Sequence, residues 1–196
     1  MNEATRSVGR YRAIDLTLFA MILAFFETVV RTAAVRWFPA QPYTVSVTPA
    51  VTAIVMMRWG PWAGIHAFLG GLVYCLVSGG QTEHYGIYCL GSLLCLVCLY
   101  PLKRAGKEAV RADTFKSLLL ALGVTVLMQT GRAAIALMLG HAPAEAAGFY
   151  TTDVITLLFT LIVIWIARRL DGVFEDQKHY LSRLKSERET QEGGVS

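Results

Sequence analysis

Charged side chains are scarce in this sequence of 196 residues. Asp, Glu, Lys and Arg together make up 16% of the chain, against 55% hydrophobic residues. That balance excludes an ordinary soluble domain, in which about a quarter of the residues are charged. The charges are also segregated, because they concentrate in residues 1–12, 103–116 and 168–189 and are almost absent from long windows between. This segregation is typical of a protein whose chain crosses a membrane several times.

Motifs for catalysis, metal binding or nucleotide hydrolysis are also missing. No HExxH or other zinc-like pattern joins the four histidines, and there is no GxSxG motif and no phosphate-binding P-loop. The C-x-x-C pair of Cys95 and Cys98 has no histidine or carboxylate beside it, and its spacing suits two small packing residues on a helix. The sequence therefore predicts no catalytic residue, no metal site and no cofactor.

Apolar runs long enough to cross a membrane are what the chain has in quantity. A crossing helix needs about 17 to 25 mostly apolar residues, and four runs meet this requirement: residues 13–35, 62–78, 115–139 and 149–168. Two shorter runs, residues 43–58 and 85–101, can also cross if neighbouring helices shield their ends. Pro49 interrupts the first of these, which makes it the weakest. The sequence predicts an all-α integral membrane protein, a bundle of six transmembrane helices.

Basic residues indicate how this bundle is oriented. Six crossings put both termini on one side, and 15 of the 18 Lys and Arg residues fall in segments on that side. Because positive charge gathers in cytoplasmic loops, both termini are predicted to be cytoplasmic, in a multi-pass protein of the cytoplasmic membrane. The net charge of +4 then reflects a basic rim beside anionic lipid and requires no nucleic-acid partner.

The last part of the chain, residues 171–196, is predicted to be a tail outside the six-helix domain of residues 1–170. Apolar residues stand at loose helical spacing among its charges; they are Val173, Phe174, Tyr180, Leu181 and Leu184. An amphipathic cytoplasmic helix on the membrane or against a partner, and a plain solvated tail, both fit this pattern.

Small residues mark two surfaces where another helix can approach closely. The stretch "RWGPWAGIHAFLGG" predicts a tight helical hairpin at Gly60 and Pro61, since glycine permits a positive φ and proline suits the first turn of a helix. After this turn, one side of the next helix lacks bulky side chains at Gly64, Gly70 and Gly71. Ala20 and Ala24 form a similar face on the first helix. Such faces serve either packing within one bundle or docking of a partner.

Taken together, these features resemble the substrate-binding S components of energy-coupling factor (ECF) vitamin transporters. The resemblance covers about residues 10–170 and rests on the six short helices, on Ala20-x-x-x-Ala24, and on the turn quoted above, which is similar to that family's GPxxG turn. It implies a solute-binding subunit of an ABC-type importer for a vitamin or vitamin-like molecule. It also implies a membrane-embedded T component and two ATPase subunits as partners, with the alanine and glycine faces turned toward the T component. Many members have an acid near the outer end of the third helix, where this chain has none.

Ionisable groups inside the predicted spans are the strongest candidates for a solute site. An arginine at mid-helix costs about 2.5 to 3.5 kcal/mol on insertion, so Arg132 requires a partner. Gln129 lies one turn below it, and Asp153 is a candidate counter-charge, although Asp153 could instead interact with the dipole of its own helix. Glu27 and Arg31 stand four residues apart in the order that favours an intrahelical ion pair, and direct contact with a solute is the alternative.

Residues of the predicted outer loops complete the candidate set. Hydrogen-bonding and aromatic side chains gather there, and they are Gln81, Glu83, His84, Tyr85 and Tyr150. A concave, mostly apolar pocket with a few polar anchors suits a small heteroaromatic solute, although a membrane-interface belt accounts for much of the aromatic content. The sequence does not indicate which solute.

Two other classes of membrane protein remain as alternatives. Glu27-x-x-x-Arg31 and Trp62-x-x-x-His66 resemble fragments of motifs in intramembrane CAAX-type proteases. At 1.5 Å per residue, however, Glu27 and His66 are expected in different leaflets, where they cannot share a proton. A self-standing small-molecule carrier or channel is the other alternative, because oligomers could create a pore.

Overall fold

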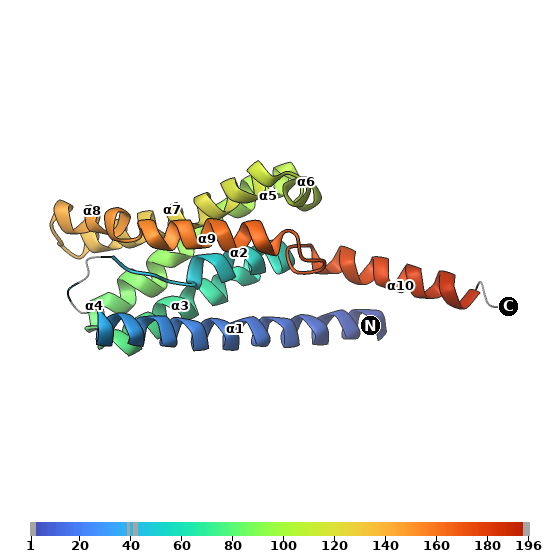
Figure 1. The fold of residues 1–196 in the computed structure, drawn as a ribbon, viewed down its shortest axis with the longest axis horizontal. Helices are drawn as coiled ribbons and strands as arrows, with labels where there is room; N and C mark the ends of the chain where they lie inside the picture. The colour runs from blue at the N-terminus through green and yellow to red at the C-terminus, as the bar shows by residue number, and fades with distance from the viewer. Residues whose placement is uncertain (1–2, 39, 41–42, 194–196) are drawn as a thin grey trace.

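Helices are the only regular elements in the part of the chain that the structure describes. The structure is a computed structural model and describes residues 3–38, 40 and 43–193. The long helices α1 (Glu3–Trp37), α7 (Thr114–Met138) and α9 (Val154–Ala167) run along the long axis of the molecule (Figure 1). The predicted all-α fold is therefore confirmed.

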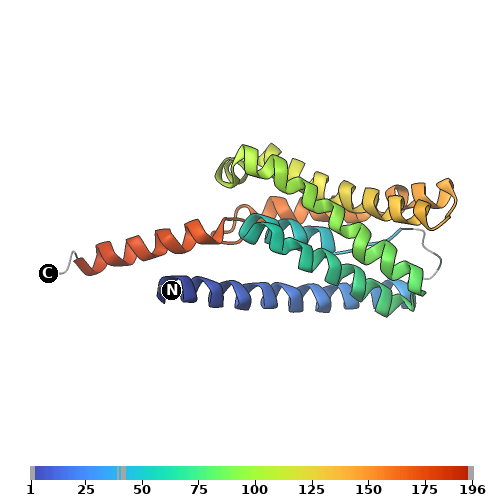
Figure 2. The same ribbon diagram turned by 180° about the vertical axis from the view of Figure 1, so that it is seen from behind.

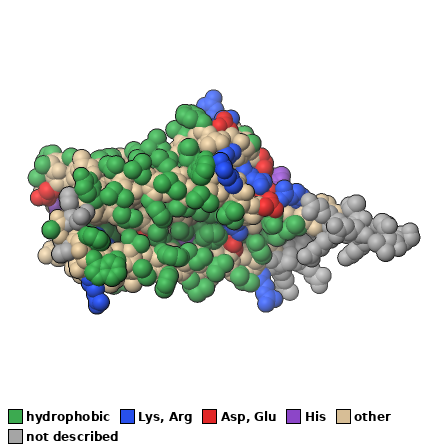
Figure 3. All heavy atoms as spheres, in the orientation of Figure 1, with side chains coloured by type: hydrophobic (Ala, Val, Ile, Leu, Met, Phe, Trp, Pro, Cys, Tyr) green, Lys and Arg blue, Asp and Glu red, His purple; other side chains and the backbone are tan. Residues whose placement is uncertain are grey.

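Among the residues that the structure describes, five helical stretches are long and apolar enough to cross a membrane. They are Val8–Trp37, Thr48–Ser78, Thr82–Ala105, Thr114–Met138 and Pro143–Ala167. Large apolar side chains are exposed along the outer face of α1, among them Ile14, Met21, Phe25 and Val29. Figure 3 shows such side chains covering the middle of the molecule, while most charged side chains lie toward the end from which α10 (Gln177–Gly193) emerges. These features are those of a multi-pass membrane protein.

The second apolar stretch is folded into the predicted hairpin. Helix α2 (Thr48–Trp59) ends at Gly60, whose φ of 64° begins the short 3-10 turn η1 (Gly60–Trp62), and α3 (Ala63–Ser78) follows. A Cβ atom on Gly70 would collide with the side chain of Thr48, so α2 lies back along α3. Helix α2 has 12 residues, all buried, and its length of about 18 Å is too short for a crossing by itself.

The third apolar stretch is helical but irregular. It consists of α4 (Thr82–Tyr85), the π-helical η2 (Gly86–Leu90), the 3-10 helical η3 (Ser92–Cys98) and α5 (Leu99–Ala105). Segment η3 packs along α7, and η2 packs against both α3 and α7. Because π and 3-10 turns rotate side chains away from the ordinary helical register, the polar residues of this stretch cannot be assigned to a face by 3.6-residue periodicity.

The remaining short helices lie at the two ends of the bundle. Helix α8 (Pro143–Thr152) caps the end that also holds α4, while α6 (Lys107–Ala112) lies at the other end, where α1 begins and α10 leaves the bundle (Figures 1 and 2). The tail differs in one respect from the amphipathic helix that the sequence predicts. Val173 and Phe174 belong to the turn that precedes α10, and Phe174 is fully buried in the core. Those two residues anchor the tail to the bundle and do not form its apolar face.

Candidate functional site

A buried ion pair forms the centre of the polar cluster at the α4 and α8 end. Arg132 on α7 and Asp153, which lies between α8 and α9, are 5% and 8% exposed. The Nη1 atom of Arg132 lies 3.6 Å from Oδ2 of Asp153. Gln129 bridges them, because its amide NH2 donates to Asp153 and its carbonyl oxygen accepts from Arg132 at 3.3 Å. The predicted counter-charge for Arg132 is thus confirmed, and such pairing offsets part of the cost of burying both charges.

A close backbone crossing brings a further hydrogen-bond partner to Arg132. A Cβ atom on Gly91 would lie 2.7 Å from the backbone of Arg132, and one on Gly131 would collide with the carbonyl oxygen of Gly91. Only glycine permits this approach. It places the hydroxyl of Ser92 at 3.0 and 3.1 Å from Nη2 and Nε of Arg132. Ser92 in turn donates to the carbonyl oxygen of Tyr88 at 2.6 Å.

Two stacked tyrosines adjoin this cluster. The rings of Tyr74 on α3 and Tyr88 on η2 have centroids 4.2 Å apart and planes inclined by 26°. The contact depends on Gly71, because a Cβ there would collide with the backbone of Tyr88. The guanidinium of Arg132 lies 5.0 Å from the ring of Tyr88, and that of Arg31 lies 4.2 Å from the ring of Tyr74. Cation, ring, ring and cation therefore form a contiguous row, and each cation–π contact is favourable in a desolvated site.

Glu27 stabilises the buried start of α2. Its Oε2 atom accepts hydrogen bonds from the hydroxyl of Ser46 at 2.9 Å, the backbone N–H of Val47 at 2.9 Å and the hydroxyl of Thr48 at 3.0 Å. The first N–H groups of a helix lack intrahelical partners and attract negative charge, so a carboxylate from α1 satisfies this end of α2 inside the bundle. Arg31 instead donates to the hydroxyl of Ser78 at 2.7 Å. The predicted intrahelical pair of Glu27 and Arg31 is therefore wrong.

An extended segment, residues 43–46, closes the site from the side of α9 (Figure 1). The hydroxyl of Thr44 donates to Asp153, and its backbone N–H donates to the carbonyl oxygen of Thr152 at 3.0 Å. The hydroxyl of Thr156 accepts from the backbone N–H of Ser46 at 3.1 Å and donates to the carbonyl oxygen of Thr44 at 3.1 Å. These bonds hold the extended segment against the beginning of α9.

Three neighbouring cavities surround the row of cations and rings. The innermost, of about 30 Å³, is lined by Arg132, Asp153, Thr44 and both stacked tyrosines, and has room for a water molecule. A second, of about 190 Å³, shares the two tyrosines and adds Arg31. A third, of about 490 Å³, lies between α1 and the extended segment and shares Arg31 and Thr44 with the other two. The polar groups thus satisfy one another in a closed arrangement that adjoins larger spaces.

The predicted outer-loop residues divide between the edge of this site and the surface beyond it. His84 lines the 190 Å³ cavity and accepts from the backbone N–H of Gln81 at 2.9 Å. Glu83 is exposed, 3.9 Å from His141. Tyr150 is 42% exposed and its hydroxyl donates to Thr130 at 2.9 Å, so it lies outside the cavities. Tyr85 is half-buried on α4 and lines none of the three cavities described here.

The predicted partner-binding residues separate in the same way. Ala20 and Ala24 are half-buried on the flank of α1, next to its exposed apolar face. Gly70 and Gly71 are buried against Thr48 and Tyr88, and Gly64 faces Leu96. The assignment of Gly70 and Gly71 to a partner surface is therefore wrong, because those two glycines are occupied by packing within the chain.

Several site residues escaped the sequence analysis. They are Thr44, Tyr74, Ser78, Tyr88 and Ser92. Tyrosine and serine can enter an apolar helix at low cost, so neither demands a partner as arginine does. The sequence carried no signal that separates Tyr74 and Tyr88 from an interface belt, because each stands about one helical turn from an end of its apolar run.

Comparison of the chain with models of protein families, with curated proteins and with solved structures finds no match in any of the three. A function for this chain is therefore inferred from its own sequence and geometry.

Proposed function

We propose that this protein is the membrane-embedded solute-binding subunit of an ECF-type importer for a vitamin-like small molecule. In this proposal the chain crosses the cytoplasmic membrane six times, residues 43–59 counting as one crossing made of an extended half and the short α2. The proposal places both termini in the cytoplasm, which the distribution of basic residues supports. The polar cluster around Arg132 then lies in the outer half of the bilayer, open to solute from outside.

The observation that carries the proposal is the contiguous row of Arg31, Tyr74, Tyr88 and Arg132. A bundle that needed only to be stable would fill this space with apolar side chains, since buried ion pairs contribute little net stability. Intramembrane ionisable groups are retained chiefly where they contact a solute or an ion. Here two cations and two aromatic rings meet beside cavities that could merge around a ligand.

The row favours a flat aromatic solute that carries an anionic or hydrogen-bond-accepting group. A flat ring stacks on tyrosine, as the two tyrosines now stack on each other. Arg132 is balanced by Asp153, whereas Arg31 is within ion-pairing distance of no carboxylate among the described residues. Arg31 is therefore the side chain assigned to the acidic group of the solute, and Arg132 positions the ring of Tyr88.

Delivery across the membrane requires a partner in this proposal, because the sequence contains no nucleotide-hydrolysis motif. The exposed apolar face of α1, with Ala20 and Ala24 on its flank, is the surface assigned to the T component, which is coupled to two ATPase subunits. Small residues there let a partner helix approach closely. Replacement of Ala24 by tryptophan is expected to abolish uptake in cells and leave solute binding intact.

The binding test begins with native mass spectrometry of the purified full-length protein, which reveals a co-purified small molecule. Affinity for that molecule is then measured for Arg31→Gln and Tyr74→Ala, and for Tyr100→Ala as the control. Tyr100 is 73% exposed at the opposite end of the molecule. We expect at least about tenfold weaker binding for the first two variants and no change for the control. Equal affinity in all of them would remove the row from the site.

The two alternatives are distinguished by separate observations. Glu27 is engaged at the start of α2, and the Nε2 atom of His66 lies 3.1 Å from the carbonyl oxygen of Leu16, so the two groups have different partners. Peptide cleavage that depends on His66 would nevertheless favour an intramembrane enzyme. Solute flux into vesicles that hold only this protein, without ATP, would favour a self-standing carrier.

A further inference from the structure

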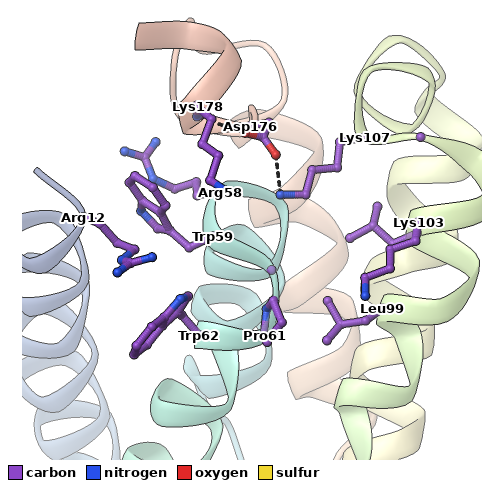
Figure 4. Close-up of a pocket in the computed structure, with 13 residues that line it drawn as sticks. Arg12, Arg58, Trp59, Pro61, Trp62, Leu99, Lys103, Lys107, Asp176 and Lys178 are labelled. Carbon is purple, nitrogen blue, oxygen red and sulfur yellow. Dashed lines mark hydrogen bonds and ion pairs between the residues drawn. The ribbon is translucent and has the colours of Figure 1, made fainter. Parts of the chain in front are cut away.

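A second hollow lies at the other end of the molecule, between η1, α5 and the residues that lead into α10 (Figure 4). Its volume is about 380 Å³. Two tryptophans and apolar residues form part of its wall: Trp59, Trp62, Pro61, Leu99 and Leu102. Five basic side chains and one acid complete the charged part of the lining: Arg12, Arg58, Lys103, Lys107, Lys178 and Asp176.

Carboxylates of the described residues neutralise two of these five basic side chains. Arg58 pairs with Asp15 through contacts of 2.6 and 2.8 Å, and Nζ of Lys107 lies 2.6 Å from Asp176. Arg12, Lys103 and Lys178 form no ion pair within the described part of the chain; the guanidinium of Arg12 lies over the ring of Trp62 at 4.6 Å. Three uncompensated positive charges from α1, α5 and α10 therefore line one hollow.

Other cations at this end of the molecule are of two kinds: Arg104 and Arg169 are exposed and form no ion pair with a described residue but do not line the hollow, whereas others have partners. Arg111 on α6 pairs with Glu175 at 2.9 Å, and Lys116 pairs with Asp113 at 3.7 Å. Arg168 donates to the carbonyl oxygens of Arg111 and Ala112. Basic residues that only orient the chain in the membrane need no hollow, whereas here unpaired cations from three separate helices line one from different sides (Figure 4).

The chemistry of the hollow matches a phosphate group with an apolar attachment. Lysine and arginine are the usual ligands of phosphate, and basic pockets at the membrane surface hold the head groups of anionic lipids. Tryptophan is favoured at the same depth, because its ring is amphipathic. Trp59 is fixed there by a 2.6 Å hydrogen bond from its Nε1 to Asp15, and Trp62 is 42% exposed.

We infer that this hollow binds a phosphate-bearing anion through Arg12, Lys103 and Lys178, independently of the function proposed above. The anion is either the head group of a lipid such as phosphatidylglycerol or a soluble phosphate ester; the two share the group that the cations contact. Because these cations belong to α1, α5 and α10, the bound anion links three elements and stabilises the position at which α10 leaves the bundle.

The test uses the full-length protein in nanodiscs of phosphatidylcholine, with or without phosphatidylglycerol. Native mass spectrometry counts retained lipid, and the thermal unfolding midpoint is followed as glycerol 3-phosphate is added. Lys103→Gln combined with Lys178→Gln removes two charges from the hollow. Arg104→Gln combined with Arg169→Gln removes two charges from exposed positions nearby that do not line it. Because Lys103 and Lys178 are exposed and unpaired with any described carboxylate, the first pair of changes leaves the packing intact.

We expect the wild-type protein to gain thermal stability from one phosphate source, and which source acts identifies the ligand. The Lys103 and Lys178 variant should bind that source about tenfold more weakly or worse, while the Arg104 and Arg169 variant stays within about twofold of the wild type. Equal weakening in both variants would mean diffuse attraction to the basic rim and would overturn the inference. If neither source has any effect, the inference of a phosphate site is overturned as well, and an acidic protein segment becomes the better candidate for the hollow.

Discussion

The backbones of Gly91 and Gly131 touch where the third apolar stretch crosses α7. This single contact fixes the distance between the two helical segments and thereby places Ser92 against Arg132. The polar centre of the candidate site is thus built on a crossing that tolerates no side chain.

Substitution of Gly131 by alanine should destabilise the protein, because the new Cβ would collide with the carbonyl oxygen of Gly91. We expect a loss of about 1 to 3 kcal/mol, the usual cost of overpacking, measured as a lower unfolding midpoint in detergent. Gly148→Ala is the control, since a Cβ at position 148 meets no atom within 4 Å. That variant should be unchanged or more stable by up to about 1 kcal/mol. If both variants unfold at the wild-type temperature, the close crossing is not present in solution.

Removal of one member of the Arg132 and Asp153 pair should cost more than removal of both charges. Arg132→Gln leaves a buried carboxylate with its charge uncompensated, and breaking a buried pair in this way costs about 3 to 5 kcal/mol. Adding Asp153→Asn should recover a substantial part of that loss, because the two amides can then bond to each other and to Gln129. Unfolding of the single and double variants gives the coupling directly. Strictly additive losses would contradict the pairing seen at 3.6 Å.

Glu27 should behave as a structural residue and not as a ligand of the solute. Glu27→Ala leaves three hydrogen-bond donors at the start of α2 without their acceptor, and we expect a loss of about 2 kcal/mol or more in the free energy of unfolding. Glu27→Gln keeps an acceptor oxygen and should lose less, since only the interaction of the charge with the helix dipole is removed. A glutamine variant of normal stability that fails to bind solute would instead place Glu27 in the binding site.

Acid should weaken the attachment of α10 through Asp176, which lies outside the apolar spans. Burial raises the pKa of its carboxyl group, but Lys107 at 2.6 Å and the backbone N–H of Lys178 at 2.9 Å outweigh burial and lower the pKa below the ordinary 3.8. A carboxyl group with a depressed pKa stabilises the folded state above its unfolded pKa, and the stabilisation is lost as the pH falls through the folded pKa. The contribution is about 1 kcal/mol or less for such a pair near the surface.

The measurement compares unfolding midpoints at pH 7 and below pH 4. Wild type and Glu108→Gln, which changes an exposed carboxylate outside this pair, should lose the same stability between the two conditions. Asp176→Asn should be less stable at pH 7 and should lose less on acidification. An acid sensitivity identical in all three proteins would show that Asp176 contributes nothing to it.

Two features could be predicted from the sequence, because each depends on residue types that permit few alternatives: the helical hairpin and the buried ion pair. The hairpin at Gly60 follows from a glycine and a proline between two apolar runs, and the Arg132 and Asp153 pair follows from the high cost of an unpaired charge in a membrane. Spacing alone failed for Glu27 and Arg31. Their four-residue separation permits an ion pair, but the donors at the start of α2 come from a distant segment and bind the carboxylate instead.

The site residues that sequence reasoning missed depend on backbone contacts between helices. Tyr88 meets Tyr74 because Gly71 lets η2 approach α3, and Ser92 meets Arg132 because the π and 3-10 segments alter the register of the third apolar stretch. The same close contacts explain why Gly71 was assigned to a partner. A small residue indicates that a neighbour is close, but it carries no information about whether that neighbour belongs to the same chain.

The extended segment of residues 43–46 makes one side of the bundle different from the rest, which is helical. Extended chain advances about 3.3 Å per residue, so four residues cover the depth that a helix would need about nine to span. This part of the wall has no internal hydrogen-bond ladder to unwind, and its attachment to α8 and α9 consists of a few separate bonds from Thr44 and Ser46. Glu27 of α1 holds the other side of the segment by accepting from Ser46 and Val47. Beside Asp153, individual hydrogen bonds and not helix packing therefore join this part of the bundle to its neighbours.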